Sequence, residues 1–198
     1  LCHTFGTMAT GGFSTKNASI GHYNSAWVDS IITVFMLIAG INFSLHFRTL
    51  TGRIRHYITD GETRFFLTLI IAGFLIVFGD IYLGHDYRLG EAIQKGLFQV
   101  VSIITTTGYG TDDYEMWGTS SQLILYIFMF IGGCAGSTGG AMKVMRTLVI
   151  LKFSMNELKR LLHPQAVLSV RIGDRTVPKE IVTNIAGFFL IYMALFVL

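Results

Sequence analysis

Four long apolar stretches, residues 26–47, 65–83, 123–151 and 181–198, restrict this chain to folds that a lipid bilayer can hold. A helix needs about 20 apolar residues to cross the hydrocarbon core, so each stretch is a candidate membrane span. Charged residues make up only 14% of the chain, against about 25% in soluble domains. This leaves too little polar surface for a water-soluble globule. We therefore predict an all-α membrane protein rather than the core helices of a soluble one.

The basic residues predict an orientation in the membrane. Four arginines lie in the link after the first stretch: Arg48, Arg53, Arg55 and Arg64. Lysines and arginines also crowd residues 152–179, after the third stretch, whereas the opposite ends carry few. Links rich in Lys and Arg stay in the cytoplasm. Both links are therefore expected in the cytoplasm, and the segments between the other ends are expected to face outward.

One outward segment carries a motif typical of ion filters. Thr106, Thr107, Gly108, Tyr109 and Gly110 follow an apolar stretch, residues 91–104, that is too short to span the membrane. The motif is close to the Thr-Val-Gly-Tyr-Gly loop whose backbone carbonyls replace the hydration shell of a potassium ion. Glycine adopts the unusual dihedral angles of such a loop at the lowest steric cost.

A second segment has the same ingredients. Ala9, Thr10, Gly11 and Gly12 follow the end of a short apolar stretch and precede Trp27, which begins the first span. A shift of 97 residues matches Thr10 with Thr107 and Gly11 with Gly108. The repeating unit is then a helix, a re-entrant pore loop and a second helix.

This organisation divides the chain into three parts. Residues 1–64 hold a pore loop, its inner helix and a cytoplasmic link; residues 65–180 hold a complete repeat; residues 181–198 hold the first helix of the next. We expect the chain to be part of a longer protein. Cys2 and Cys134 both lie in apolar segments and support neither a disulfide framework nor a zinc site.

The expected ligands of the two loops are all oxygen atoms, which suits a hard monovalent cation. We predict that backbone oxygens of Thr10, Gly11, Thr107 and Gly108 bind the ion. The negative ends of the two short helices would add to this preference for a cation. Asp112 and Asp113 follow the second loop and either raise the local cation concentration or are ordinary solvated acids.

The third apolar stretch contains an unusual cluster of small residues. It runs over residues 132–143 and comprises Gly132, Gly133, Gly136, Ser137, Thr138, Gly139, Gly140 and Lys143 among others. Five glycines in nine residues would cost a regular helix several kcal/mol, at about 1 kcal/mol each. The segment is interpreted either as an unwound gate below the second loop or as a surface for close helix packing. Lys143 either pairs with this segment or extends to the cytoplasmic edge.

Other classes of protein fit less well. A membrane-embedded enzyme would need converging polar residues, and the candidates His46, Asp80 and Lys143 are far apart in sequence. A structural subunit would use the glycine loops only as tight turns. A carrier with broken helices would have inverted repeats, whereas these repeats run in one direction.

Four stretches, residues 3–17, 40–46, 103–113 and 132–146, together resemble the Trk/Ktr/HKT superfamily of potassium transporters, and within it the bacterial TrkH family. The resemblance implies four helix–pore loop–helix repeats around one pseudo-fourfold pore, as in potassium channels. It implies that Gly11 and Gly108 are filter glycines and that residues 132–143 form an intramembrane gating loop.

The resemblance also implies potassium translocation across the bacterial inner membrane, with the pore loops facing the periplasm. Potassium would be the transported ion, with no organic cofactor. The implied partners are the lipid bilayer, a second copy in a homodimer and a cytoplasmic nucleotide-binding ring called TrkA, with no nucleic acid.

Overall fold

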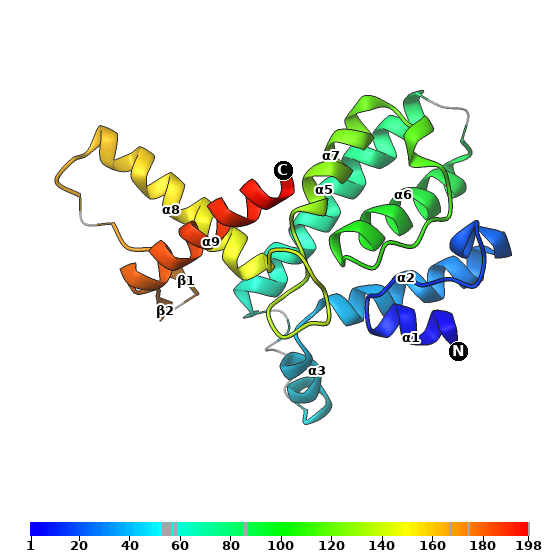
Figure 1. The fold of residues 1–198 in the computed structure, drawn as a ribbon, viewed down its shortest axis with the longest axis horizontal. Coiled ribbons are helices and arrows are strands. Elements are labelled where there is room, and N and C mark those ends of the chain that lie inside the picture. The colour runs from blue at the N-terminus through cyan, green and yellow to red at the C-terminus, as the bar shows by residue number, and fades with distance from the viewer. Residues whose placement is uncertain (53–56, 58, 85–86, 167, 174, 198) are drawn as a thin grey trace.

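The computed structural model describes residues 1–52, 57, 59–84, 87–166, 168–173 and 175–197, and Figure 1 shows their arrangement. The longer helices are α1 (Cys2–Met8), α2 (Ala26–Gly40), α3 (Phe43–Leu50), α5 (Gly61–Gly84), α6 (Leu89–Ile104), α7 (Thr119–Met129), α8 (Val144–Leu162) and α9 (Lys179–Val197). Two short 3-10 helices, η1 (Ser19–Tyr23) and η2 (Tyr114–Met116), lie in the connections. Arg53 and Arg55 of the predicted cytoplasmic link lie outside the described residues.

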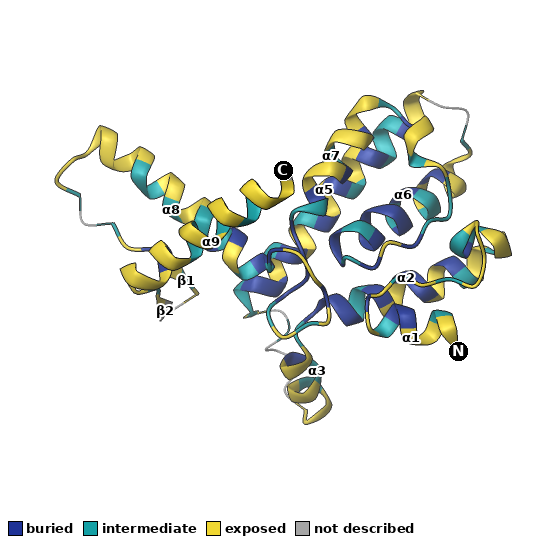
Figure 2. Ribbon diagram, in the orientation of Figure 1, coloured by how far each residue is buried: buried dark blue, intermediate teal, exposed yellow. Residues whose placement is uncertain are grey.

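Helix α6 lies among other helices and has the largest share of buried residues of the described helices. It packs against α2, α5 and α7, and Figure 2 shows its C-terminal half mostly in the colour of buried residues. Half of its sixteen residues are buried, including the polar Gln99 and Ser102. A re-entrant pore helix is tolerated at membrane depth where protein surrounds it, and α6 has such surroundings.

The first predicted span, residues 26–47, is not one helix. It ends at Gly40 and resumes at Phe43 after a bend of 100°. Ile41 is extended, and the Asn42 side chain accepts a hydrogen bond from Ser44 N at 2.8 Å, which caps the N-terminus of α3. Hydropathy alone does not reveal this bend, because both sides of the break are apolar. The signal that was available is Asn42, a preferred N-cap residue.

Two helices are long and apolar enough to cross a membrane among the described residues, namely α5 and α9, or three spans if α2 and α3 together count as one. Helix α5 begins four residues before the predicted start at position 65 and thereby includes Glu62. Large apolar side chains on α5 and α9 face outward, among them Leu75 (59% exposed) and Leu190 (69% exposed). Such faces are expected where a protein meets lipid.

The third predicted span, residues 123–151, is interrupted as the glycines indicate. Helix α7 ends at Met129 and α8 begins at Val144, and the segment between them is not helical. Figure 1 shows it as a loop between the two helices. Its ends meet at a parallel bridge between Ile131 and Met142. The glycines are therefore not part of a straight helix, and close helix packing in the usual sense is not their role.

The link after the third span, which was predicted to be cytoplasmic, contains structure that the all-α prediction did not include. Helix α8 continues to Leu162, eleven residues beyond the predicted end of the span. A two-stranded antiparallel hairpin follows, in which β1 (Arg171–Ile172) pairs with β2 (Arg175–Thr176). A small apolar cluster of Val149, Val170 and Val182 joins α8, this link and α9.

Candidate functional site

The two glycine loops have the same backbone hydrogen bonds. In the first loop, the N–H groups of Ala9, Thr10 and Gly11 donate to the carbonyls of Phe5, Thr7 and Gly6. In the second loop, the N–H groups of Thr105, Thr106 and Thr107 donate to the carbonyls of Val101, Ile103 and Ser102. Each pair of equivalent donors, and each pair of acceptors, is 96 residues apart. The two loops are therefore structural repeats.

This spacing corrects the predicted register by one residue. Thr10 corresponds to Thr106, Gly11 to Thr107 and Gly12 to Gly108. The sequence alone had suggested a shift of 97 residues between the two loops. The backbone angles agree with the new register, because φ is +65° at Gly12 and +81° at Gly108. Gly11 has no positive φ. The counterpart of Gly108 is therefore Gly12 and not Gly11.

A threonine with positive φ precedes each of these glycines by two residues. Thr10 has φ +50° and Thr106 has φ +60°. A β-branched residue in this region is strained by about 1–3 kcal/mol, and such strain is concentrated at functional sites. The residue between threonine and glycine keeps a negative φ in both loops, so the sign of φ alternates along each loop.

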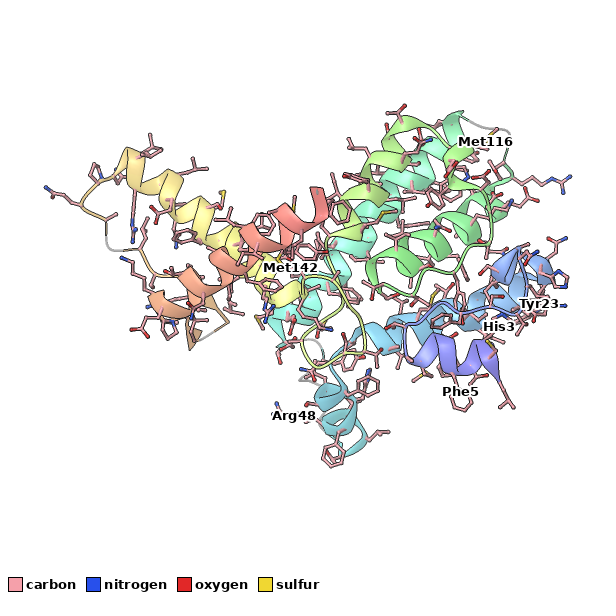
Figure 3. All side chains as sticks on the ribbon, in the orientation of Figure 1. His3, Phe5, Tyr23, Arg48, Met116 and Met142 are labelled. Carbon is pink, nitrogen blue, oxygen red and sulfur yellow. The ribbon has the colours of Figure 1, made fainter. Side chains whose placement is uncertain are left out.

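Tyr109 joins the second loop to the first. Its side chain is fully buried, and its hydroxyl lies 3.3 Å from the carbonyl of His3 and 3.4 Å from that of Phe13. A Cβ atom added to Gly6 would lie 2.3 Å from that hydroxyl, so the close approach requires glycine. Figure 3 labels His3, next to Tyr23, at the N-terminal helix on which Tyr109 rests.

The loops also meet directly through their backbones. A Cβ atom at Gly12 would lie 2.0 Å from the carbonyl oxygen of Thr107. The N–H of Gly21 donates to the carbonyl of Gly110 at 3.1 Å, and the N–H of Gly110 donates to Ser19 Oγ at 3.3 Å. The predicted filter residues of both loops are thus brought together, although they are almost 100 positions apart in the sequence.

Hydroxyl groups behind the second loop hold its shape. Ser102 Oγ donates to the carbonyl of Tyr109 at 2.7 Å, and Thr105 Oγ1 lies 2.8 Å from Thr107 Oγ1. All four residues are buried, whereas Gly108 between them is exposed. A Cβ atom at Gly108 would meet no heavy atom of the described residues within 4 Å. Gly108 is thus an exposed position in a loop whose neighbouring residues Thr107 and Tyr109 are buried.

The glycine-rich segment lies directly against the second loop. The N–H of Gly140 donates to Thr106 Oγ1 at 2.6 Å, and a Cβ atom at Gly139 would lie 3.2 Å from the carbonyl oxygen of Thr105. Inside the segment, a Cβ atom at Gly132 would lie 2.0 Å from the carbonyl of Gly140. The glycines therefore allow backbone segments to touch one another where side chains would not fit.

The same segment is attached to the break between α2 and α3. The N–H of Cys134 donates to the carbonyl of Gly40 at 2.9 Å, and the N–H of Phe43 donates to the carbonyl of Gly136 at 3.1 Å. Thr138 Oγ1 donates to the carbonyl of Ala39 at 3.3 Å. The polar backbone groups freed by the helix break are thereby paired with those freed in the glycine-rich segment.

Lys143 pairs with the segment rather than extending away from it. Its Nζ atom donates to the carbonyl of Ser137 at 3.3 Å and also to that of Gly139. The ammonium group thus binds the carbonyls of the turn that lies against the second loop. Figure 3 labels its neighbour Met142, at the entrance to α8. Of the two interpretations of Lys143, the structure favours pairing.

The two acids beyond the second loop have structural partners. Asp112 forms an ion pair of 3.0 Å with Lys95 and accepts a hydrogen bond of 2.8 Å from the Tyr87 hydroxyl. Burial raises the pKa of Asp112, but Lys95, Tyr87 and the N–H of Asp113 together lower that pKa below its ordinary value. Asp113 accepts from the N–H of Glu115 at 3.1 Å and caps η2. Asp112 is therefore paired, whereas Asp113 is exposed and accepts only this local hydrogen bond among the described residues.

The three residues considered for an enzyme do not converge. His46 Nε2 lies 2.8 Å from the carbonyl of Ile38, Asp80 accepts from Ser121 Oγ at 2.5 Å, and Lys143 binds the glycine-rich segment. Within the described residues, no three His, Cys, Asp or Glu side chains gather in a way that could hold a metal ion.

The sequence interpretation missed Glu62, which is 4% exposed. Its Oε1 atom accepts hydrogen bonds from Ala135 N at 2.6 Å and Met145 N at 3.1 Å, on either side of the glycine-rich turn. An acid just before an apolar stretch looks like an ordinary interfacial residue, and no local pattern distinguishes it.

Comparison with known proteins identifies the family to which this arrangement belongs. The TrkH family, described as cation transport protein, matches residues 1–198. The chain belongs to the TrkH family. The predicted fold class is thereby confirmed. The family is one of transport proteins, so the match favours transport over a membrane-embedded enzyme.

Members of the TrkH family resemble the chain over its whole length. The Trk system potassium uptake protein TrkH of Halomonas elongata is 44% identical over 200 residues, which is 100% of this chain and 41% of that protein. TrkH of Escherichia coli is 42% identical over 98% of this chain and 41% of its own length.

The crystal structure of the potassium transporter TrkH from Vibrio parahaemolyticus matches with a TM-score of 0.93 and 40% identity, covering 98% of this chain and 42% of that one. The chain thus spans about two fifths of the length of these relatives.

Proposed function

We propose that this chain forms part of the pore of a potassium uptake protein in the bacterial inner membrane. The observation that supports this most strongly is the pair of interlocked loops with equivalent hydrogen bonds and alternating signs of φ. A backbone of this kind can turn successive carbonyls toward one side, which is the requirement of a cation filter. The names of the relatives, potassium uptake proteins, agree with this proposal.

In the proposed filter, potassium loses its water and binds backbone oxygens of the two loops. The residues concerned are Ala9, Thr10, Gly11, Gly12, Thr106, Thr107, Gly108, Tyr109 and Gly110. The corrected register assigns the two equivalent glycine positions to Gly12 and Gly108. Potassium is the transported ion and not a resident cofactor.

The gate of this proposal is the glycine-rich segment of residues 132–143. It lies against Thr105 and Thr106 at one side of the loop, and it is held by Lys143 and by the helix break at Gly40. A segment with so little side-chain bulk can change its backbone conformation without repacking a core. Its movement would open the path that leads away from the filter.

The arrangement in the membrane and the partners complete the proposal. The pore loops face the periplasm, and the basic residues after α3 and within residues 152–179 lie in the cytoplasm, as the distribution of Lys and Arg indicates. Residues 1–64, 65–180 and 181–198 belong to three successive repeats. A homodimer and a cytoplasmic TrkA-like ring are the expected partners.

The test uses a full-length protein that contains this chain. Gly108→Val should reduce potassium uptake at least tenfold in cells that lack other uptake systems, because valine disfavours φ of +81° and narrows the open face of the loop. The matched control is Gly90→Val in α6, at an exposed position where a Cβ atom would meet no described atom within 4 Å. Uptake that is normal in Gly108→Val, with normal amounts of protein in the membrane, would refute the filter.

A further inference from the structure

Glu62 is a buried carboxylate whose hydrogen-bond partners come from outside its own helix. It lies in the first turn of α5, yet its Oε1 atom binds Ala135 N and Met145 N, more than 70 positions later in the chain. Ala135 is inside the glycine-rich segment, and Met145 is the second residue of α8. One oxygen atom therefore connects the start of the glycine-rich turn with the helix that follows it.

The hydrogen bond to Met145 satisfies a need of α8. The first N–H groups of a helix have no partners within the helix, and Lys143, the N-cap of α8, makes no side-chain capping bond. Val144 N donates to the carbonyl of Gly133 at 3.2 Å, and Met145 N donates to Glu62. An ionised carboxylate at this position also places a negative charge at the positive end of the helix dipole, where such a charge is most favourable.

A lysine ammonium group and an open cavity lie close to Glu62. The ammonium of Lys143 is within electrostatic reach of the carboxylate, and Lys143 itself binds the glycine-rich turn. A cavity of about 610 Å³ lies beside these groups and is lined by Arg48, Asp60, Glu62 and Met145, among others. Figure 3 labels Arg48 on α3, the helix beyond the bend. The start of α8 therefore borders open space on this side.

We propose that Glu62 is the positioning residue that holds the glycine-rich segment in its closed conformation, by capping α8 from a different helix. The inference rests on the gate of the proposed function and adds to it the group that sets the gate's resting position. Potassium does not touch Glu62. The residue acts on transport only through the backbone that it holds.

The chain contains a matched control at the other end of α5. Asp80 accepts a hydrogen bond from Ser121 Oγ and lies within 2.6 Å of where a Cβ atom of Gly118, the N-cap of α7, would be. It is thus a second α5 carboxylate at the N-terminus of a following helix. In the part of the chain that the structure describes, it binds α7 and not residues 132–143, so its neutralisation should leave the gate unchanged.

Two measurements on the full-length protein test this role. The first is hydrogen exchange of peptides covering residues 131–146, and the second is potassium flux from proteoliposomes without any regulatory partner. Glu62→Ala should accelerate exchange at Ala135 and Met145 about tenfold, as expected for the loss of charge-assisted bonds, and raise basal flux several-fold. Glu62→Gln should show a smaller effect of the same sign, because one acceptor oxygen remains. Asp80→Asn should change neither the exchange of residues 131–146 nor the basal potassium flux.

The wild-type protein provides a test that does not depend on the folding of a variant. If its amides at Ala135 and Met145 exchange as fast as unprotected ones, Glu62 does not hold the segment. If Glu62→Ala folds and exchanges faster but its basal flux equals that of the wild type, the segment is held by Glu62 but the gating role is refuted. If neither the wild type nor Glu62→Ala carries any potassium flux, the proposed function is refuted, while the exchange rates would still decide whether Glu62 holds the segment.

Discussion

Thr10 and Thr106 show how the two loops are built at the scale of single residues. Both adopt positive φ, at +50° and +60°, although threonine resists this region of backbone space. Each is followed two residues later by a glycine with positive φ. Strain of this kind persists only where the surrounding packing determines the backbone, and here Tyr109 and the loop-to-loop contacts provide that packing.

The register of the loops leads to a first prediction, in which neighbouring glycines differ. Gly12→Ala should destabilise the protein by about 1–3 kcal/mol and abolish uptake, because φ is +65° and the new Cβ would lie 2.0 Å from Thr107 O. Gly11→Ala should be much milder, since its Cβ would meet only the Phe13 ring at 3.4 Å. Thermal melting and potassium uptake measure both effects. Equal effects, or a larger one at Gly11, would restore the shift of 97 residues.

Asp112 leads to a second prediction, which concerns pH. Its pKa in the folded protein is lowered below the ordinary value, so its stabilising contribution is present above the unfolded pKa of about 3.9 and is lost as pH falls through the folded pKa. Asp112→Asn should cost about 0.5–1 kcal/mol at pH 7. This deficit should shrink below pH 4, as thermal melting of wild type and variant in parallel will show. A deficit that grows in acid would contradict the ion pair with Lys95.

At the scale of elements, α5 organises the other helices of its repeat. It packs against α6, α7 and α8, and its two carboxylates, Asp80 and Glu62, bind groups at the N-termini of α7 and α8. Gly73 lets α7 approach closely, because a Cβ there would lie 2.2 Å from the Phe128 ring. Small residues are what close helix contacts in membranes require.

The packing of α5 leads to a third prediction. Gly73→Leu should displace α7 and lower the amount of folded protein in the membrane, at a cost of about 1–3 kcal/mol, which is the usual range for overpacking. Gly79→Leu in the same helix should be tolerated, because a Cβ there would meet no described atom within 4 Å. Protein yield and melting temperature in detergent distinguish the two. If both variants behave alike, the glycines of α5 have no specific packing role.

At the scale of the whole molecule, the loops and the glycine-rich segment form one connected unit. Thr106 belongs to the second loop by its backbone and binds Gly140 N by its hydroxyl. The segment in turn is bound to the break in α2 at Gly40 and to α5 through Glu62. A displacement of α3 or α8 would therefore act on the segment directly below the loop.

The connection through Thr106 leads to a fourth prediction. Thr106→Val removes the acceptor of Gly140 N without a large change in volume and should raise basal potassium leakage several-fold. Thr106→Ser keeps the hydroxyl and should behave like the wild type. Flux from proteoliposomes without a regulatory partner is the measurement. Similar leakage in both variants would show that the hydroxyl does not couple the loop to the segment.

Local composition was sufficient to predict the class of fold and the interruption of the third apolar stretch. Apolar length indicates helices in lipid, the motif at Thr106–Gly110 indicates a re-entrant loop, and the glycines after Ile131 indicate an interruption. Each of these depends on a property that a short segment possesses by itself, namely its hydropathy or the backbone freedom of glycine.

Only the tertiary structure decided which residues of the two loops are equivalent, where α2 bends and what Glu62 binds. The register depends on hydrogen bonds to the preceding helix, and a shift by one residue changes few letters in a glycine- and threonine-rich loop. The partners of Glu62 and Asp112 come from distant positions. A buried carboxylate must find compensating donors, but which donors it finds depends on how the helices pack together.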